Sequence, residues 1–303
     1  MDMKPSGLAG WLVLVPMLFL SVFYFLISSF LSENAGAAAV LCTGICILIA
    51  FGGTKLAVGL STTLSRAVRP VPYTVSRVFR PFVAWISIAS ALLCVLLNIL
   101  LSVFSRAPFW GLSGLYPMLM ESIASHRFLT FLMLVLIPSV FEELLLRGTV
   151  FPVCGSEGTA AAVFFSALTM PMLFVYPQAV MTGLVIGLMC ALVCHMTQSL
   201  AAAVWVHFAC RFALWLCDIA AAGAGFMRFG GIWSALTLFI FLLCAYRTLR
   251  SFEGLLKDDL VAPVVRGSSD AAVNLKNLML CPGFILFAVL FFIRLISMIV
   301  TYA

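Results

Sequence analysis

The strongest constraint in this sequence is a succession of apolar runs, each long enough to cross a bilayer as a helix of ~20 residues. Charged residues make up only 9% of the chain, against about 25% in soluble domains, and mean hydropathy is +1.20. A water-soluble fold could not cover its surface with so few polar side chains. We therefore expect an all-α fold, a polytopic transmembrane helical bundle of about eight or nine spans. The runs lie near residues 8–31, 36–53, 82–104, 128–153, 159–176, 178–195, 199–222, 229–246 and 278–301.

The chain is expected to form a single integral membrane domain over residues 1–303, because so many spans leave little length for a soluble part. The first run is too long for the apolar part of a signal peptide, which predicts a retained first helix. Two polar stretches, 54–80 and 247–277, are predicted to be cytoplasmic loops. As an alternative, the first lies on the lipid surface and the second begins with an amphipathic interfacial helix.

The placement of lysine and arginine predicts the orientation. With nine spans and a cytoplasmic N-terminus, the cations in inner loops outnumber those in outer loops, as the positive-inside rule requires. Positive residues beside apolar runs favour anionic lipid headgroups as partners, and nucleic acid is not expected. The inner set is Lys4, Lys55, Arg66, Arg69, Arg77, Arg80, Arg247, Arg250, Lys257, Arg266 and Lys276, and the outer set is Arg106, Arg127 and Arg228.

The 10 cysteines do not predict a disulfide framework, because most of them lie inside apolar runs. There they are expected to pack as small apolar side chains. Cys190 and Cys194, next to His195, weakly resemble a pair of metal ligands. No second ligand pair accompanies them, so packing is the preferred interpretation.

Ionisable residues within the apolar runs are the strongest functional signal, because each costs ~2.5–3.5 kcal/mol on insertion scales. Glu143 and Arg147 are four residues apart, and so are His207 and Arg211, which places each pair on one helix face. Glu142 points ~100° away from Glu143. Counted from the ends of their runs, Glu142 and His207 are predicted to lie at similar depth in a common cavity. The alternative, favoured for Glu143 with Arg147, is that these charges only neutralise one another between packed helices.

The pattern Glu142-Glu143-x-x-x-Arg147-Gly148, followed about sixty residues later by Ser199-Leu200 and then His207, resembles a known family. It is similar to the CAAX-protease and bacteriocin-processing family of intramembrane endopeptidases, which includes the Abi proteins. The resemblance predicts a family-like catalytic core at roughly 128–222.

By this resemblance, Glu142 activates water, Glu143 and Arg147 support it, and His207 helps to stabilise the oxyanion. It leaves the cofactor unknown: a divalent metal remains an alternative without a convincing ligand set. Arg211 stands where the family has an asparagine. It either donates to the oxyanion or pairs with Glu142, which would make the carboxylate a poorer base.

The family's second motif, a phenylalanine followed four residues later by a histidine, is incomplete. In one frame Phe165 leads to Thr169, and in another Met170 leads to Phe174, so neither frame has the histidine. Phe165, Thr169 and Phe174 are kept as candidate substrate-binding residues.

The leading hypothesis for function is therefore an intramembrane endopeptidase that cleaves a hydrophobic or membrane-proximal peptide near the inner face. A pseudoprotease, which binds such a peptide without cutting it, is the alternative. A proton-coupled transporter is a third interpretation, but it predicts inverted repeats, and none is visible. The expected location is a bacterial inner or plasma membrane.

Overall fold

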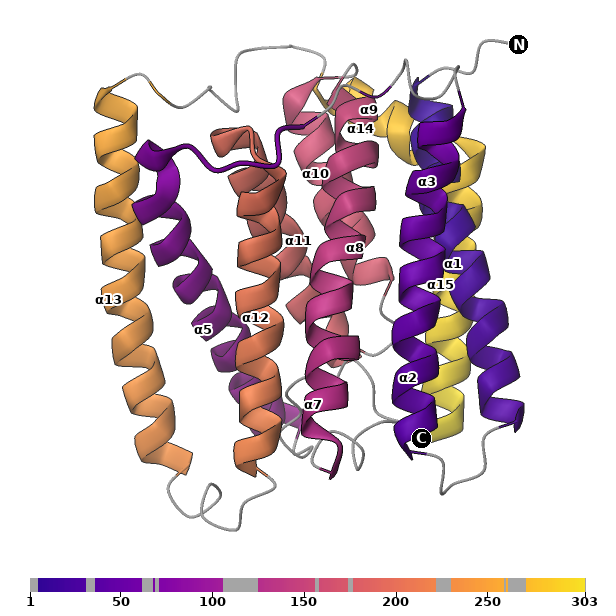
Figure 1. Cartoon of the computed structure of the whole chain (residues 1–303), viewed down its shortest axis with the longest axis horizontal. Helices are drawn as coiled ribbons and strands as arrows, with labels where there is room; N and C mark the ends of the chain where they lie inside the picture. The colour runs from indigo at the N-terminus through magenta and orange to yellow at the C-terminus, as the bar shows by residue number, and fades with distance from the viewer. Residues whose placement is uncertain are drawn as a thin grey trace.

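The computed structural model of this chain describes a bundle of helices (Figure 1). Every regular element within the described ranges is helical, which confirms the predicted all-α class. Seven of these helices are long and apolar enough to cross a membrane, or up to eight if a bent pair counts as one span. The chain is thus an integral membrane protein. The described residues are 5–30, 36–61, 68, 71–105, 125–155, 158–173, 177–221, 230–258, 260 and 271–302.

The helices follow the predicted apolar runs closely. The α2 helix continues through η1 into α3, and α7 to α9 likewise form one continuous helical rod that includes η5 and η6. The segments η1, η5 and η6 are π-helical and are called wide turns below, because their hydrogen bonds join residues five apart. The bounds are α1 Pro5–Phe30, α2 Gly36–Ile47, η1 Leu48–Gly52, α3 Gly53–Leu60, η2 Arg77–Phe79, α5 Arg80–Ser105, α7 Arg127–Thr130, η5 Phe131–Leu136, α8 Ile137–Leu145, η6 Leu146–Val150, α9 Phe151–Cys154, α10 Thr159–Met172, α11 Pro177–Thr197, α12 Leu200–Ala221, α13 Gly230–Lys257, α14 Ala271–Met279 and α15 Pro282–Tyr302.

Two of the nine predicted spans differ from a simple crossing. The α10 helix has 14 residues and is therefore only ~21 Å long, shorter than the ~30 Å apolar layer. The last span follows a sharp bend, because α14 and α15 meet at 68°. Pro282 at the start of α15 lacks the N–H that would continue α14 into it.

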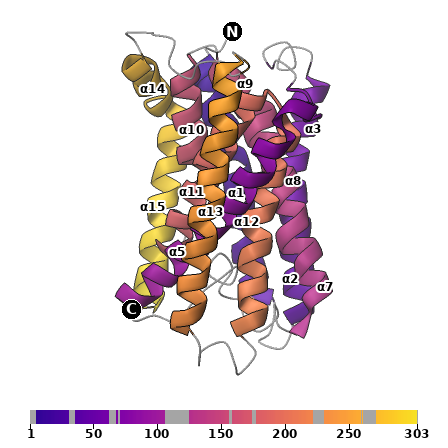
Figure 2. The ribbon, with the colours of Figure 1, turned by 90° about the vertical axis from the view of Figure 1, so that its left-hand side faces the viewer.

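The helices around α8 form the centre of the bundle, while α13 lies at one edge and α1, α2 and α15 lie at the other (Figures 1 and 2). The α5 helix packs against α11, α12 and α13, and α10 pairs with α11. Only 6% of the α13 segment Ile232–Lys257 is buried, so most of this apolar helix is available to lipid.

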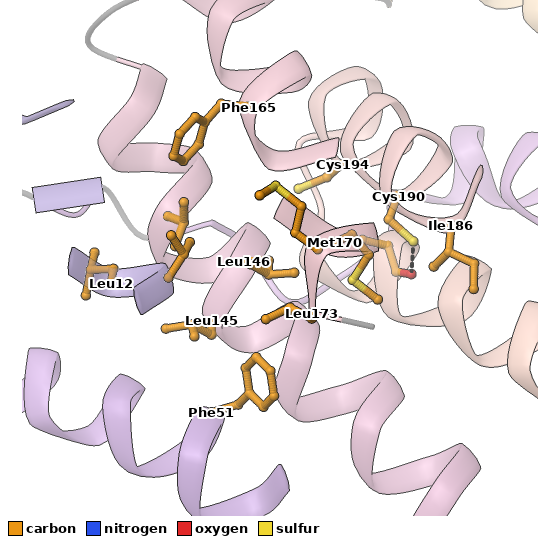
Figure 3. Close-up of a cluster of buried hydrophobic side chains, with 14 of the residues drawn as sticks. Leu12, Phe51, Leu145, Leu146, Phe165, Met170, Leu173, Ile186, Cys190 and Cys194 are labelled. Atoms are coloured by element: carbon orange, nitrogen blue, oxygen red, sulfur yellow. Dashed lines mark hydrogen bonds between the residues drawn. The ribbon is translucent and has the colours of Figure 1, made fainter. Parts of the chain in front are cut away.

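A buried apolar cluster joins the N-terminal helices to the central ones (Figure 3). Leu145 and Leu146, from the helix that also carries the glutamates, lie within it. Phe165 and Met170 come from α10, and Ile186 and Cys190 from α11. The rod that contains α8 packs against α10 and α11 through η6 and α9, while α8 itself packs against α12 and η1. The polar side chains of α8 are therefore held on an element fixed on several sides.

Small residues allow the closest helix contacts, as is usual in membranes. A side chain at Gly187 would put its Cβ 2.5 Å from the carbonyl oxygen of Ala167 and 2.7 Å from the Cβ of Met170. A glycine is therefore needed there for α10 and α11 to approach each other.

The structure is still helical at the residues where both cytoplasmic loops were predicted to begin. Residues 54–60 are helical, and Lys55 is held by the carbonyl oxygen of Gly148 rather than by solvent alone. The other loop was expected from residue 247, but α13 continues to Lys257. This end is polar yet helical, and Glu253 forms exposed ion pairs there with cations three residues before it and four residues after it.

One end of the bundle collects the cationic segments. The end of α3, the start of α5, the end of α13 and the helix α14 all lie at the upper end in Figure 1. These segments carry Lys55, Arg77, Arg80, Arg247, Arg250, Lys257 and Lys276. The start of α7, which carries Arg127, lies at the opposite end.

Candidate active site

The two glutamates lie on the short helix α8, which is bounded by wide turns on both sides. Proline occurs at position 138, within the first turn of α8, and again at position 152, just after η6. A proline has no N–H for the carbonyl four residues before it, so Leu134 and Gly148 each lose their α-helical donor. Carbonyls in the wide turns are therefore open to donors from other helices.

Glu143 is held by a cation on its own helix and by a histidine on α12. Its Oε1 accepts a hydrogen bond from Arg147 Nη1 at 2.9 Å, as the spacing of four residues predicted. Arg147 Nη2 donates to the carbonyl oxygen of Gly187 at 2.6 Å. This arginine thus ties η6 to α11 at Gly187, a residue that lies directly against α10.

His207 bridges the two halves of the cluster. Its Nδ1 lies 2.8 Å from Glu143 Oε1, and its Nε2 accepts a hydrogen bond from Arg211 Nε at 2.7 Å. Since a guanidinium only donates, Nε2 must carry the lone pair and Nδ1 the proton. In this arrangement the imidazole directs its N–H towards Glu143 and offers none to an oxyanion.

Arg211 uses all three of its nitrogens within the cluster. Besides Nε, its Nη1 donates to the carbonyl oxygen of Leu134 at 3.1 Å. Its Nη2 lies 2.8 Å and 2.9 Å from the two carboxylate oxygens of Glu142. Glu142 Oε2 is also 3.6 Å from His207 Nε2. The predicted meeting of Glu142 with His207 therefore occurs, with Arg211 between them.

The whole cluster is removed from solvent and its charges balance. Glu143, Arg147, His207 and Arg211 are 0% exposed, and Glu142 is 3% exposed. With a neutral imidazole, two carboxylates face two guanidiniums. Buried charges are tolerated when they are paired and hydrogen-bonded in this way. Glu143 Oε2 and Arg147 Nε have no hydrogen-bond partner among the described residues, so polar capacity remains inside the cluster.

The structure brings five of the predicted site residues together and places two others elsewhere. Phe165 packs on Phe284 of α15, with ring centroids 5.0 Å apart. Thr169 is buried, and its hydroxyl donates to the carbonyl oxygen of Ser166. Phe174 lies outside the described residues. The catalytic and substrate-binding roles of all these side chains stay predictions.

Sequence reasoning missed three contributors to the cluster. Two are the backbone carbonyls of Leu134 and Gly187, which accept from Arg211 and Arg147. Pro138 could have signalled the first, because it deprives Leu134 of its helical donor. The third is Cys190, whose thiol donates to the carbonyl oxygen of Ala203 at 3.4 Å (Figure 3). Its nearness to the glutamates depends on helix packing, which spacing alone does not encode.

Three side chains of metal-ligand type come together in this cluster. Ligand atoms of Glu143, Cys190 and His207 all lie within 4.8 Å of one another. However, Glu143 Oε1 already accepts from Arg147 and faces the N–H of His207, and Arg211 adds a second positive charge beside the imidazole. A cation would have to displace these contacts, so the arrangement fits a metal poorly.

A comparison with known families gives a match that spans this segment of the chain. Residues 124–213 match the sequence model of a family described as Rce1-like, type II CAAX prenyl endopeptidase Rce1-like. This segment is Rce1-like. It contains all five residues of the cluster and agrees with the CAAX-protease resemblance predicted from the double glutamate. No curated protein and no solved structure matches the chain.

The Rce1-like segment covers α7 to α11 and the first part of α12, and it thus includes η5, α8, η6, α11 and α12, which supply the contacts of the cluster. The protein is thus an integral membrane protein with an Rce1-like segment at its centre. Helices α1 to α5 and α13 to α15 lie outside the matched segment and surround it (Figure 1).

Proposed function

We propose that this protein is an intramembrane endopeptidase that hydrolyses a membrane-proximal peptide bond with a water activated by Glu142. The observation that carries the proposal is the convergence of Glu142, His207 and Arg211 from two helices in a buried site. Arg211 donates hydrogen bonds to both the carboxylate and the imidazole, which lie 3.6 Å apart. The match of this same segment to the Rce1-like family supports the choice of reaction.

The chemistry needs a base and a donor aimed at the developing negative charge. Glu142 accepts a proton from water as the water oxygen attacks the peptide carbonyl. Arg211 donates to the resulting oxyanion, and Glu142 then passes the proton to the leaving nitrogen as the C–N bond breaks. Because Arg211 now contacts both oxygens of Glu142, substrate entry must move this guanidinium towards the peptide carbonyl.

The substrate side of the site is proposed to face the cytoplasm. The end of the bundle that carries Lys55, Arg77, Arg80 and the basic end of α13 would be cytoplasmic under the positive-inside rule. The partners are then membrane lipids and a hydrophobic or membrane-proximal peptide. The apolar face of α13 would contact acyl chains.

A second function, that of a pseudoprotease, is favoured by one specific observation. Arg211 bonds both the intended base and the intended oxyanion donor, because Glu142 and His207 Nε2 each accept from it. The histidine of the family's second motif is also replaced, by Thr169 or Phe174 according to the frame. A peptide bound beside such a closed cluster would be held without being cut.

Cleavage by the purified protein separates the two functions. The protein is reconstituted in proteoliposomes with a library of quenched fluorescent peptides, each with one apolar segment, and products are identified by mass spectrometry. An endopeptidase cuts at least one peptide, and Glu142→Gln lowers the rate by ~10²-fold or more, because a general base is lost. The matched control is Glu253→Gln, an exposed glutamate on α13, which leaves the rate unchanged.

Two outcomes would contradict the endopeptidase. If Glu142→Gln cleaves as fast as the wild type, the activity does not come from this site. If the wild type binds peptides saturably but yields no products, the pseudoprotease is correct. In that case Arg211→Asn, which releases Glu142 and restores the residue type of the family, is the variant expected to gain cleavage.

A further inference from the structure

Lys55 lies on α3, outside the Rce1-like segment, yet it contacts the helix that carries the glutamates. Its Nζ donates to the carbonyl oxygen of Gly148 at 2.8 Å, across 93 residues of sequence. The lysine is only partly exposed. A cation on a neighbouring helix therefore reaches the backbone next to Arg147.

The carbonyl that Lys55 binds is one that cannot be satisfied in the ordinary helical way. Its α-helical donor would be the N–H of residue 152, which is a proline. An unsatisfied buried carbonyl is costly, so the donor has to come from elsewhere. Lys55 supplies it.

The same arrangement occurs at the other side of the glutamates. Pro138 removes the α-helical donor of Leu134, and Arg211 Nη1 supplies the replacement. The double glutamate is therefore flanked by two proline-released carbonyls, each bound by a cation from a different helix. Arg211 belongs to the cluster itself, whereas Lys55 touches only the backbone.

We propose that Lys55 is a positioning residue for the candidate active site. By holding the carbonyl of Gly148, it fixes the wide turn η6 and with it the direction of the neighbouring Arg147. Arg147 then orients Glu143, Glu143 holds His207, and His207 meets Arg211 at Glu142. This series of contacts links α3 to the proposed base.

The inference rests on the proposed endopeptidase, and it makes a separate prediction for the backbone. Loss of the Lys55 ammonium leaves η6 less ordered, so the amides of residues 149–154 exchange hydrogen faster. Residue 152 is excluded, since it has no amide hydrogen. The second variant, Pro152→Ala, restores an N–H at the position that the Gly148 carbonyl needs. It is expected to make Lys55 dispensable.

The experiment compares Lys55→Met, Lys55→Arg, Pro152→Ala and the double variant Lys55→Met/Pro152→Ala in proteoliposomes. The control is Lys257→Met, which removes an exposed lysine on α13. With the reporter peptide that the wild type cleaves fastest, Lys55→Met is expected to lower kcat about tenfold and to change KM less than twofold, because a misplaced catalytic group costs turnover. Lys55→Arg and the double variant recover most of kcat, and Lys257→Met has no effect.

Three results would overturn the proposal. The first is a loss of folded protein in Lys55→Met with kcat per folded molecule unchanged, since that is a purely structural role. The second is a double variant that is no more active than Lys55→Met. The third is unchanged hydrogen exchange in residues 149–154 of Lys55→Met. If the wild type cleaves no peptide, the proposed function fails, while hydrogen exchange and its reversal by Pro152→Ala still decide whether Lys55 holds η6.

Discussion

Two ion pairs in this protein have the same spacing and the same length but lie in opposite surroundings. Glu143 with Arg147 and Glu253 with Lys257 are both separated by four residues, and both have N–O distances of 2.9 Å. The first pair is 0% exposed on both sides, whereas Glu253 and Lys257 are 48% and 71% exposed. Spacing and length are therefore the same, and the pairs differ in solvent access and in the further contacts of Glu143 and Arg147 with His207 and Gly187.

We infer that the buried pair affects the stability of the folded state, whereas the exposed pair hardly does. A buried charge that loses its partner cannot be rehydrated, so the loss falls on the folded state. At the edge of α13, water and salt replace a missing partner at little cost. Four measurements test this difference between the two pairs.

The largest effect is expected from Glu143→Leu. Arg147 and His207 would then keep buried donors without their acceptor, which costs about 3–5 kcal/mol in the free energy of unfolding. Denaturant titration in detergent micelles measures the change. Glu253→Leu is the matched control and should leave the titration midpoint where it is. Equal losses in the two variants would show that burial is not the deciding factor.

A smaller net loss is expected when both members of the buried pair are removed. Glu143→Leu/Arg147→Met leaves no isolated charge, and apolar replacements of buried pairs are often close to neutral. We expect the double variant to regain at least half of the stability lost in Glu143→Leu, with the remainder reflecting the unpaired His207 and the carbonyl of Gly187. A double-mutant cycle from the same titrations gives the coupling. A double variant less stable than Glu143→Leu would contradict this expectation.

Arg147 binds the carbonyl oxygen of Gly187 on α11, and the packing at this glycine can be tested by substitution. Gly187→Ala adds a methyl group against Ala167 and Met170, and overpacking of this kind costs about 1–3 kcal/mol. A methyl group added at Gly254 on α13 would meet nothing within 4 Å. Gly254→Ala should therefore be neutral or slightly stabilising in the same unfolding assay, and a loss there equal to that of Gly187→Ala would refute the packing argument.

The smallest effect is expected from Glu253→Gln. Its ion pairs with Arg250 and Lys257 are exposed and are screened by salt. The variant should match the wild type in thermal unfolding at physiological ionic strength and differ slightly only at low salt. A salt-independent loss of stability would mean that the end of α13 packs more tightly than its exposure indicates.

The sequence predicted the buried cluster because its members follow simple helical spacing. Glu143 with Arg147 and His207 with Arg211 are each four residues apart, and both contacts are present. The similar depth of Glu142 and His207 followed from counting residues along two helices. Helical spacing is a local property, and depth depends only on the thickness of the membrane. Both could therefore be predicted from this single sequence.

What the sequence did not predict depends on how helices rotate and pack. His207 was expected to share a cavity with Glu142, and its Nε2 lies 3.6 Å from that carboxylate. Its hydrogen bond to Glu143, with Nδ1 at 2.8 Å from Oε1, was not predicted. The partner of Lys55 could not be predicted either, although Pro152 marks the carbonyl that needs one. A proline in the sequence shows that a backbone carbonyl lacks its helical donor, whereas tertiary contacts determine which group replaces that donor.

The pairing of Glu142 with Arg211 also bears on how the protein is made. The two residues are separated by 69 positions, so Glu142 emerges from the ribosome and enters the bilayer well before Arg211 exists. Until α12 arrives, α8 carries a carboxylate in lipid without this partner. Until then, α8 bears the cost of an unpaired ionisable residue, ~2.5–3.5 kcal/mol on insertion scales, which the contact with Arg211 later offsets.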